Sequence, residues 1–153
     1  MAMISQTAEY ALRAVVHLAA EDETMSQTVE QIAAGTRVPA GYLSKVLQSL
    51  SRAGLISSQR GLGGGFRLVK TAKEISVLEV IRAVDPIQRI LTCPLGLAAH
   101  GTRLCPLHKR LDDAVAMIEE VFGAATIAEM LDKPENQPKS SSTTGLCAFP
   151  LKV

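Results

Sequence analysis

The sequence predicts a mainly α-helical chain with one small β-hairpin. Aromatic residues make up only 3% of the 153 residues and Trp is absent, so Ala, Leu, Val and Ile must form most of the core. This composition favours closely packed helices over a β-sandwich. Several segments also repeat apolar residues at helical spacing, and one glycine-rich stretch lies between two short apolar runs.

The first predicted helix covers residues 7–20. Its apolar residues follow the spacing of one helix face: Tyr10, Ala11, Ala14, Val15, Leu18 and Ala19. A second, short helix is predicted after Thr28, because Thr28 and Gln31 form the capping-box pattern that satisfies exposed backbone N–H groups. Gly35 is expected to end this helix, since glycine suits a left-handed C-terminal position.

A third helix and a hairpin follow. Pro39 suits the first position of a helix and Gly54 suits its end. The apolar stripe between them consists of Leu43, Val46, Leu47 and Leu50. Residues 55–58 and 66–69 are predicted as short strands on either side of a flexible, glycine-rich tip. Two helices joined by a short turn and followed by such a hairpin predict a winged helix-turn-helix.

The C-terminal half is predicted to contain three more helices. Ser76 opens the first of these through a second capping box, and Pro86 follows its end. Residues 107–122 continue an apolar stripe for about four turns, with a charged opposite edge, so this helix could either complete the domain or form half of a dimer interface. Thr126 then caps a short terminal helix.

Charge is divided unevenly along the chain. Residues 37–73 carry seven cations and no Asp or Glu, whereas the remainder carries nine cations against fifteen acids, which gives a formal net charge of +1 overall. A block of one sign attracts a polyanion such as DNA, but a solvated cationic face explains the charge equally well. The predicted winged helix decides between the two and favours DNA.

These features divide the chain into four parts. Residues 1–86 are expected to form a winged helix-turn-helix DNA-binding domain, and residues 87–106 a cysteine-containing sensor loop. Residues 107–131 hold the dimerisation helix and the short terminal helix, and residues 132–153 are expected to be a disordered tail. With no signal peptide and no apolar run of about 18 residues, a soluble cytoplasmic protein without a membrane partner is expected.

The predicted architecture assigns residues to DNA contact. The second helix of the pair presents Ser44 to base edges and Tyr42 and Lys45 to phosphates, while Arg60 in the wing suits a narrow minor groove. The alternatives are a hairpin without a role and a nucleotide-binding loop, which would need a helix where a strand is predicted. The predicted DNA-binding residues are Thr28, Pro39, Ala40, Gly41, Tyr42, Ser44, Lys45, Gln48, Arg60, Gly61, Gly63, Gly64 and Gly65.

Short motifs occur in a characteristic order along this segment. They are Tyr42-Leu43, Gly54-Leu55-Ile56, Arg60-Gly61-x-Gly63-Gly64-Gly65-Phe66-x-Leu68 and Ile75-Ser76-Val77. Their order resembles the Rrf-two family of bacterial winged-helix regulators over residues 4–131, most specifically in the glycine-rich wing. The resemblance implies a homodimer, whose long helices pair and set two recognition helices against a roughly palindromic double-stranded DNA operator. Ser44 stands where relatives often carry an acidic base reader, so the resemblance does not give the operator sequence.

The same resemblance implies an iron-sulfur cluster held by three cysteines before the dimerisation helix. Cys93 and Cys105 occupy the outer two places, but Ala99 occupies the middle one, with His100 beside it. Because one thiolate is missing, other ligands would have to complete the site. A two-iron cluster (2Fe-2S) is expected rather than a four-iron cluster (4Fe-4S), since mixed Cys and His ligation is known for two-iron centres.

Two further residues match ligand positions in relatives. His108 stands at the position of a His ligand, and Glu9 at the position of a carboxylate supplied by the opposite subunit. Arg13 replaces a His that one variant of the site uses, so that ligand is absent. The metal-ligand candidates are therefore Cys93, Cys105, His108, Glu9 and His100. A dithiol switch, a zinc site and a lost site with two ordinary cysteines remain alternatives.

Together these features predict a homodimeric transcriptional regulator, a repressor, whose operator binding responds to redox state or nitric oxide. The alternatives are a cluster-free regulator that uses a Cys93 and Cys105 thiol switch or zinc, and a winged-helix module that binds an acidic protein. An enzyme is not expected, because no nucleophile and base pair or carboxylate pair stands in a recognisable pocket motif. Cys147 lies in the predicted tail and is not expected to join the site.

Overall fold

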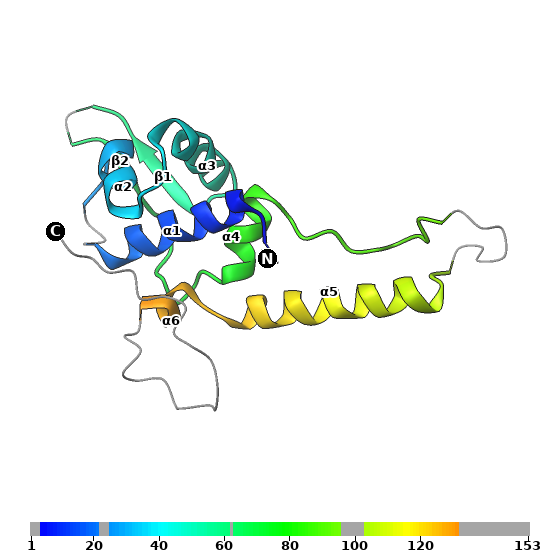
Figure 1. The fold of residues 1–153 in the computed structure, drawn as a ribbon. Helices are drawn as coiled ribbons and strands as arrows, with labels where there is room; N and C mark the ends of the chain where they lie inside the picture. The colour runs from blue at the N-terminus through cyan, green and yellow to red at the C-terminus, as the bar shows by residue number, and fades with distance from the viewer. Residues whose placement is uncertain (1–3, 22–24, 62, 96–102, 132–153) are drawn as a thin grey trace.

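The computed structural model describes residues 4–21, 25–61, 63–95 and 103–131, and it confirms the mainly helical fold with one hairpin (Figure 1). The elements are α1 (Gln6–Ala20), α2 (Val29–Thr36), α3 (Ala40–Arg52), β1 (Ile56–Gln59), β2 (Gly65–Leu68), α4 (Val77–Val84), α5 (Pro106–Ala124) and α6 (Ile127–Leu131). The two strands are antiparallel, with Ile56 opposite Leu68 and Gln59 opposite Gly65. Each strand differs from its predicted span by one residue.

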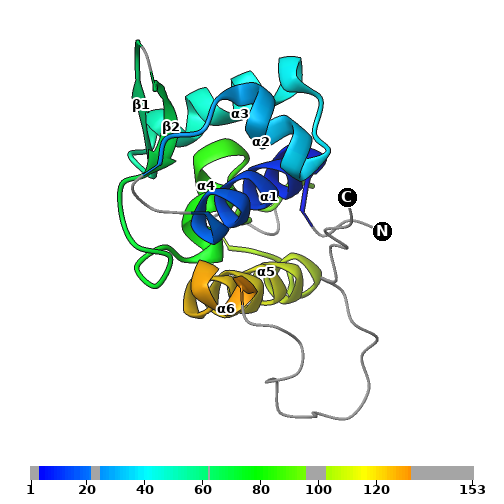
Figure 2. The ribbon, with the colours of Figure 1, turned by 90° about the vertical axis from the view of Figure 1, so that its left-hand side faces the viewer.

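Helix α1 lies at the centre of the winged-helix body, formed by α1–α4, the hairpin and α6 (Figure 2). Ala8, Ala11 and Ala14 on its inner face are completely buried, and their small side chains let neighbouring helices approach closely. The largest fully buried side chains around them come from every other part of this body: Ile32, Leu43, Leu47, Leu50, Ile56, Ile75, Ile81 and Ile127. One shared core therefore fixes α3 and the hairpin relative to each other.

The capping boxes predicted at Thr28 and Ser76 are both present at the starts of α2 and α4. Thr28 Oγ1 accepts a hydrogen bond from the Gln31 N–H at 3.3 Å, and the Gln31 side chain accepts one from the Thr28 N–H at 2.8 Å. Helix α2 ends at Thr36, within one residue of the predicted end, but Arg37 and not Gly35 adopts the left-handed conformation, with φ 57°. A side chain at position 35 would overlap the imidazole of His17, so space rather than backbone conformation requires this glycine.

The wing is joined to the chain that precedes α2. The Gln27 N–H donates to the Phe66 carbonyl at 2.9 Å, and the Phe66 N–H donates back to the Gln27 carbonyl at 2.8 Å. The side chain of Gln27 also contacts His17 of α1, with 2.8 Å between Oε1 and Nε2. The hairpin is therefore anchored through β2 to α1 and to the start of the helix-turn-helix.

The connector, residues 85–95, and α5 project from the body as an arm (Figure 1). After α5 the chain rejoins the body, where the Val77 N–H donates to the Ala125 carbonyl and the Ile127 N–H donates to the Ile75 carbonyl, both at 2.9 Å. Several large apolar side chains of α5 are exposed: Leu107, Leu111, Met117 and Val121. No helix in the described part of the chain is long and apolar enough to cross a membrane.

Candidate functional site

The surface that the sequence assigns to DNA lies on the side of the body away from α5 and α6, where α3 and the hairpin are found (Figure 2). All seven cations of the basic block are exposed: Arg37, Lys45, Arg52, Arg60, Arg67, Lys70 and Lys73. Lys70 forms an ion pair with Glu79 at 3.4 Å. Lys45 and Arg52 lie on α3, and Arg60 and Arg67 lie in the wing, so these two elements expose cations, as a polyanion-binding surface must.

Helix α3 supports this surface through four buried side chains, Leu43, Val46, Leu47 and Leu50, on its opposite face. Lys45 and Gln48 are exposed on the outer face. The Ser44 hydroxyl donates to the Ala40 carbonyl at 3.0 Å, so its lone pairs remain available as acceptors. The outer face of α3 therefore combines a cation, an amide and a hydroxyl acceptor near its N-terminus.

Tyr42 has a role that sequence reasoning missed. Its hydroxyl lies 2.7 Å from that of Thr7 on α1, and its ring meets the Tyr10 ring edge-on with centroids 5.5 Å apart. The ring remains 41% exposed. Tyr42 thus links the recognition helix to α1 as well as facing outward.

The wing tip presents Arg60 to solvent. Two of its glycines are required by the chain itself. A Cβ at Gly64 would lie 2.5 Å from the Gln59 carbonyl oxygen, and one at Gly65 would collide with the backbone of Gln27. These close approaches explain part of the glycine-rich motif without DNA.

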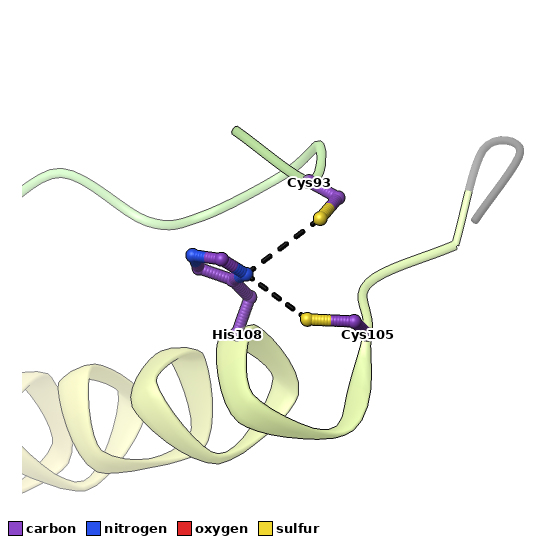
Figure 3. A group of neighbouring side chains, drawn as sticks. All are labelled: Cys93, Cys105 and His108. Atoms are coloured by element: carbon purple, nitrogen blue, oxygen red, sulfur yellow. Dashed lines mark hydrogen bonds between the residues drawn. The ribbon is translucent and has the colours of Figure 1, made fainter. Parts of the chain in front are cut away.

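A cluster of two thiols and one imidazole lies at the N-terminal end of α5, as Figure 3 shows. Cys105 is the N-cap residue of α5, His108 lies one turn later, and Cys93 comes from the connector. Nδ1 of His108 is 3.1 Å from the Cys105 sulfur and 3.6 Å from the Cys93 sulfur. All three ligand atoms lie within 4.8 Å of one another, and the cysteines are not disulfide-bonded.

The position of Cys105 changes its acidity. The backbone N–H of His108, and then its side chain, stabilise the thiolate and lower the pKa of Cys105 from 9.0 to about 7. Thiolates at helix N-termini are generally favoured in this way. The thiolate is the form that binds metal and reacts with oxidants, so the lowered pKa of Cys105 favours both kinds of chemistry.

The structure does not bring all five predicted ligands together. Cys93, Cys105 and His108 form the cluster, whereas Glu9 lies on α1 and pairs with Arg13. His100, like Ala99 and Cys147, lies outside the described residues. The described part of the chain therefore supplies three ligand atoms to one site.

An ion-pair network that the sequence did not reveal lies next to this cluster. Arg89 of the connector donates to both oxygens of Asp112 on α5, each at 2.7 Å, and the Ile90 N–H donates to Asp112 Oδ1 at 3.0 Å. These bonds lower the pKa of Asp112 to about 2, mainly because of Arg89. Glu119 lies 3.6 Å from Arg89 and 2.8 Å from Arg82 of α4, so the network continues into the winged-helix body.

Comparison with known families decides the class of the protein. The sequence model of the Rrf2 family, described as "Iron-dependent Transcriptional regulator", matches residues 4–133. The chain belongs to the Rrf2 family. It is therefore a winged-helix transcriptional regulator and not an enzyme, as the sequence predicted.

Individual Rrf2 proteins agree with this assignment. The HTH-type transcriptional regulator NsrR of Geobacillus kaustophilus is 34% identical over 129 residues, which cover 81% of this chain and 86% of NsrR. The structure of CymR, the global cysteine regulator of B. subtilis, has a TM-score of 0.69 at 23% identity, covering 85% of this chain and 96% of CymR. T. potens IscR has a TM-score of 0.71 at 22% identity, covering 91% and 94%. The two structures share the fold with this Rrf2 chain.

The donor set of this Rrf2 chain fits iron as well as zinc. Ligand atoms of a tetrahedral ion lie about 3.5 Å apart when each bond is about 2.0–2.3 Å. The separations of 3.1 and 3.6 Å around His108 Nδ1 are close to that spacing. Thiolate and imidazole are also ligands of iron-sulfur centres. Cys93, Cys105 and His108 are therefore chemically suited to hold iron or zinc.

Proposed function

We propose that this Rrf2 regulator is a homodimeric repressor that binds an operator through α3 and the wing. The proposal rests on the outward face of α3 and on Arg60, which stands exposed at the end of β1. Helix α3 would enter the major groove, with Ser44 and Gln48 at base edges and Lys45 at a phosphate. Arg60 would enter the minor groove, where negative potential favours a guanidinium. The other residues proposed to contact DNA are those predicted from the sequence: Thr28, Pro39, Ala40, Gly41, Tyr42, Gly61, Gly63, Gly64 and Gly65.

The proposed dimer forms through α5. Leu107, Leu111, Ala114, Ile118 and Val121 recur every three or four residues along this helix. The side chains of Leu107 and Val121 are 62% and 64% exposed, which is unusual for apolar residues spaced in this way. A second copy of α5 packed on this row would bury it and place two winged-helix bodies at a fixed spacing. Leu111→Glu should therefore give a monomer in sedimentation, whereas Met117→Gln, off this row, should not.

We infer that Cys93, Cys105 and His108 hold an iron-sulfur cluster, of the two-iron type. The single observation that carries this inference is the convergence of the two sulfurs on His108 Nδ1, at 3.6 and 3.1 Å. Glu9 of the partner subunit or His100 would complete the ligand set. When bound, such a cluster supplies a one-electron redox couple and an iron that reacts with nitric oxide.

The chain's own residues connect this site to DNA binding. Glu9 lies on α1, and α1 packs directly against α2 and α3. A Glu9 that reaches the arm of the other subunit would join the ligand residues of one chain to the helix-turn-helix of its partner. Operator half-sites lie about 34–36 Å apart, so small changes in the spacing of the two bodies weaken binding.

A thiol switch is the second candidate function, and one observation favours it. The Cys105 thiol has a pKa of about 7 and lies within 4.8 Å of the Cys93 sulfur, close enough for a disulfide after a small movement. Zinc would use the same three residues. Both alternatives keep the same DNA-binding surface and differ only in what the arm holds.

One experiment separates these possibilities. Protein purified without oxygen is examined by visible absorption and by iron, sulfide and zinc analysis, together with Cys93→Ala, Cys105→Ala and, as the matched control, Cys147→Ala. We expect thiolate-to-iron absorption that the first two variants lose and the control retains. Zinc without sulfide would assign a zinc site. A colourless, metal-free protein that still prefers its operator over random DNA at fixed salt would leave the thiol switch.

A further inference from the structure

The connector is held against α5 at a second point besides the cysteine and histidine cluster. Arg89 makes a two-pronged contact with Asp112, through Nε and Nη2 at 2.7 Å each. The Ile90 N–H adds a bond to the same carboxylate at 3.0 Å. Asp112 is only 8% exposed, and it is the one charged residue classed as buried among the residues that the structure describes.

The spacing of these residues aligns this contact with the ligand cluster. Asp112 follows His108 by four residues on α5, which puts the two side chains on the same face about 6 Å apart along the helix axis. Arg89 precedes Cys93 by four residues in the connector. The Arg89–Asp112 contact and the Cys93–His108 contact are therefore successive ties between the same two segments.

We propose that Arg89 and Asp112 are positioning residues that hold Cys93 in place beside His108 and Cys105. The inference rests on the proposed function, because it concerns the same ligand site. A bidentate pair fixes orientation as well as distance, and the Ile90 bond fixes the backbone three residues before Cys93. Residues that orient ligands from outside a metal site commonly change its affinity by about 10–100-fold when removed.

The neighbouring charged residues distinguish the Arg89–Asp112 pair, which joins the connector to α5, from an ion pair within α5 alone. Glu119 also approaches Arg89, at 3.6 Å, and pairs with Arg82 of α4 at 2.8 Å, so Arg89 is held from two sides. Asp113, the next residue along α5, instead pairs with Lys109 of the same helix in an exposed contact. Asp113 therefore offers a matched carboxylate that does not touch the connector.

The test uses the full chain with Cys147→Ala, so that only Cys93 and Cys105 can react. The first measurement is titration of the metal-free protein with Co²⁺ alone, followed by thiolate-to-cobalt absorption. The second is the rate at which diamide, which accepts two electrons and two protons, converts the two thiols into a disulfide. Neither measurement needs an iron-sulfur cluster, so a failure of the cluster proposal is distinguishable from a failure of this one.

We expect Asp112→Asn to weaken Co²⁺ binding about tenfold or more and to slow disulfide formation on the order of threefold, since a loosened connector lowers the effective concentration of Cys93. Arg89→Lys keeps the charge without the planar fork and should show the same changes to a smaller extent. Asp113→Asn should leave both measurements unchanged. The proposal is overturned if Arg89→Lys and Asp112→Asn behave as the parent, or if Asp113→Asn is equally affected. Arg89→Lys remains informative if Asp112→Asn fails to fold, because Arg89 is an exposed residue.

Discussion

The hydroxyl of Tyr42 on α3 lies 2.7 Å from the hydroxyl of Thr7 on α1. Tyr42 therefore connects the recognition helix to the helix that carries Glu9, the candidate ligand for the partner's arm. Of the residues predicted to contact DNA on α3, Tyr42 alone has a described side-chain bond to another element. Its phenol can act on operator binding in two ways, by positioning α3 or by contacting a phosphate.

Tyr42→Phe should distinguish these two roles. We expect Tyr42→Phe and Thr7→Val to weaken operator affinity to a similar extent, and the double variant to be no weaker than either, because both remove one hydrogen bond worth about 0.5–1.5 kcal/mol. Affinity is measured by fluorescence anisotropy at fixed salt. If Tyr42→Phe weakens binding and Thr7→Val does not, the hydroxyl contacts DNA directly.

Arg60→Ala should reduce specific operator affinity by about 1–3 kcal/mol. It should also lower the number of counterions released on binding, read from the slope of log affinity against log salt concentration, by about one. The reason is the exposed position of this guanidinium at the wing tip. Titrations at several salt concentrations measure both effects. Arg110→Ala removes a cation exposed on the arm and serves as the control. Equal operator affinities for Arg60→Ala and the parent would rule out the wing assignment.

Gly35→Ala should destabilise the fold by about 1–3 kcal/mol, as overpacking commonly does. The new Cβ would overlap the imidazole of His17, so His17→Ala in the same chain should restore much of the loss. Thermal unfolding of the single and double variants tests this coupling. Gly41→Ala is the control, because the space around Gly41 is open and alanine favours a helix. No recovery in the double variant would contradict the contact.

The Cys105 thiol of metal-free protein should react with iodoacetamide in a pH-dependent manner. Its pKa is lowered to about 7, so half of the thiol is ionised near neutral pH and reactivity falls as the pH drops below 7. The backbone N–H of residue 108 is the main cause, so His108→Ala should retain part of this shift. Peptide mass spectrometry follows Cys105 separately from the other cysteines. A reactivity midpoint near pH 9 for Cys105 in the parent protein would contradict the lowered pKa.

Local signals account for most of what the sequence predicted correctly. The capping boxes at Thr28 and Ser76 act within four residues, and both were found as expected. The Cys93, Cys105 and His108 group was predicted from resemblance, and the structure brings those three together. The predicted left-handed conformation of Gly35 is wrong, because Arg37 adopts it instead, and the close approach of His17 from another helix is what favours glycine at position 35.

Contacts between distant segments could not be predicted in the same way. Arg89 and Asp112 are 23 residues apart, and no periodicity connects an irregular connector to a helix face. The close approach of Gly65 to Gln27 likewise depends on a backbone bridge between segments that the sequence gives no reason to pair. Such contacts depend on the packed body, which is why composition and spacing indicate the fold but not these details.

The bridge between Gln27 and Phe66 limits how the molecule can respond to a signal. It ties the wing to the chain that leads into α2, and the shared core ties α3 to both. We therefore expect α3 and the wing to move together as one unit, since packed interiors do not deform gradually. Under the proposed function, a signal from the ligand site would therefore act on α3 and the wing together and not on either element alone.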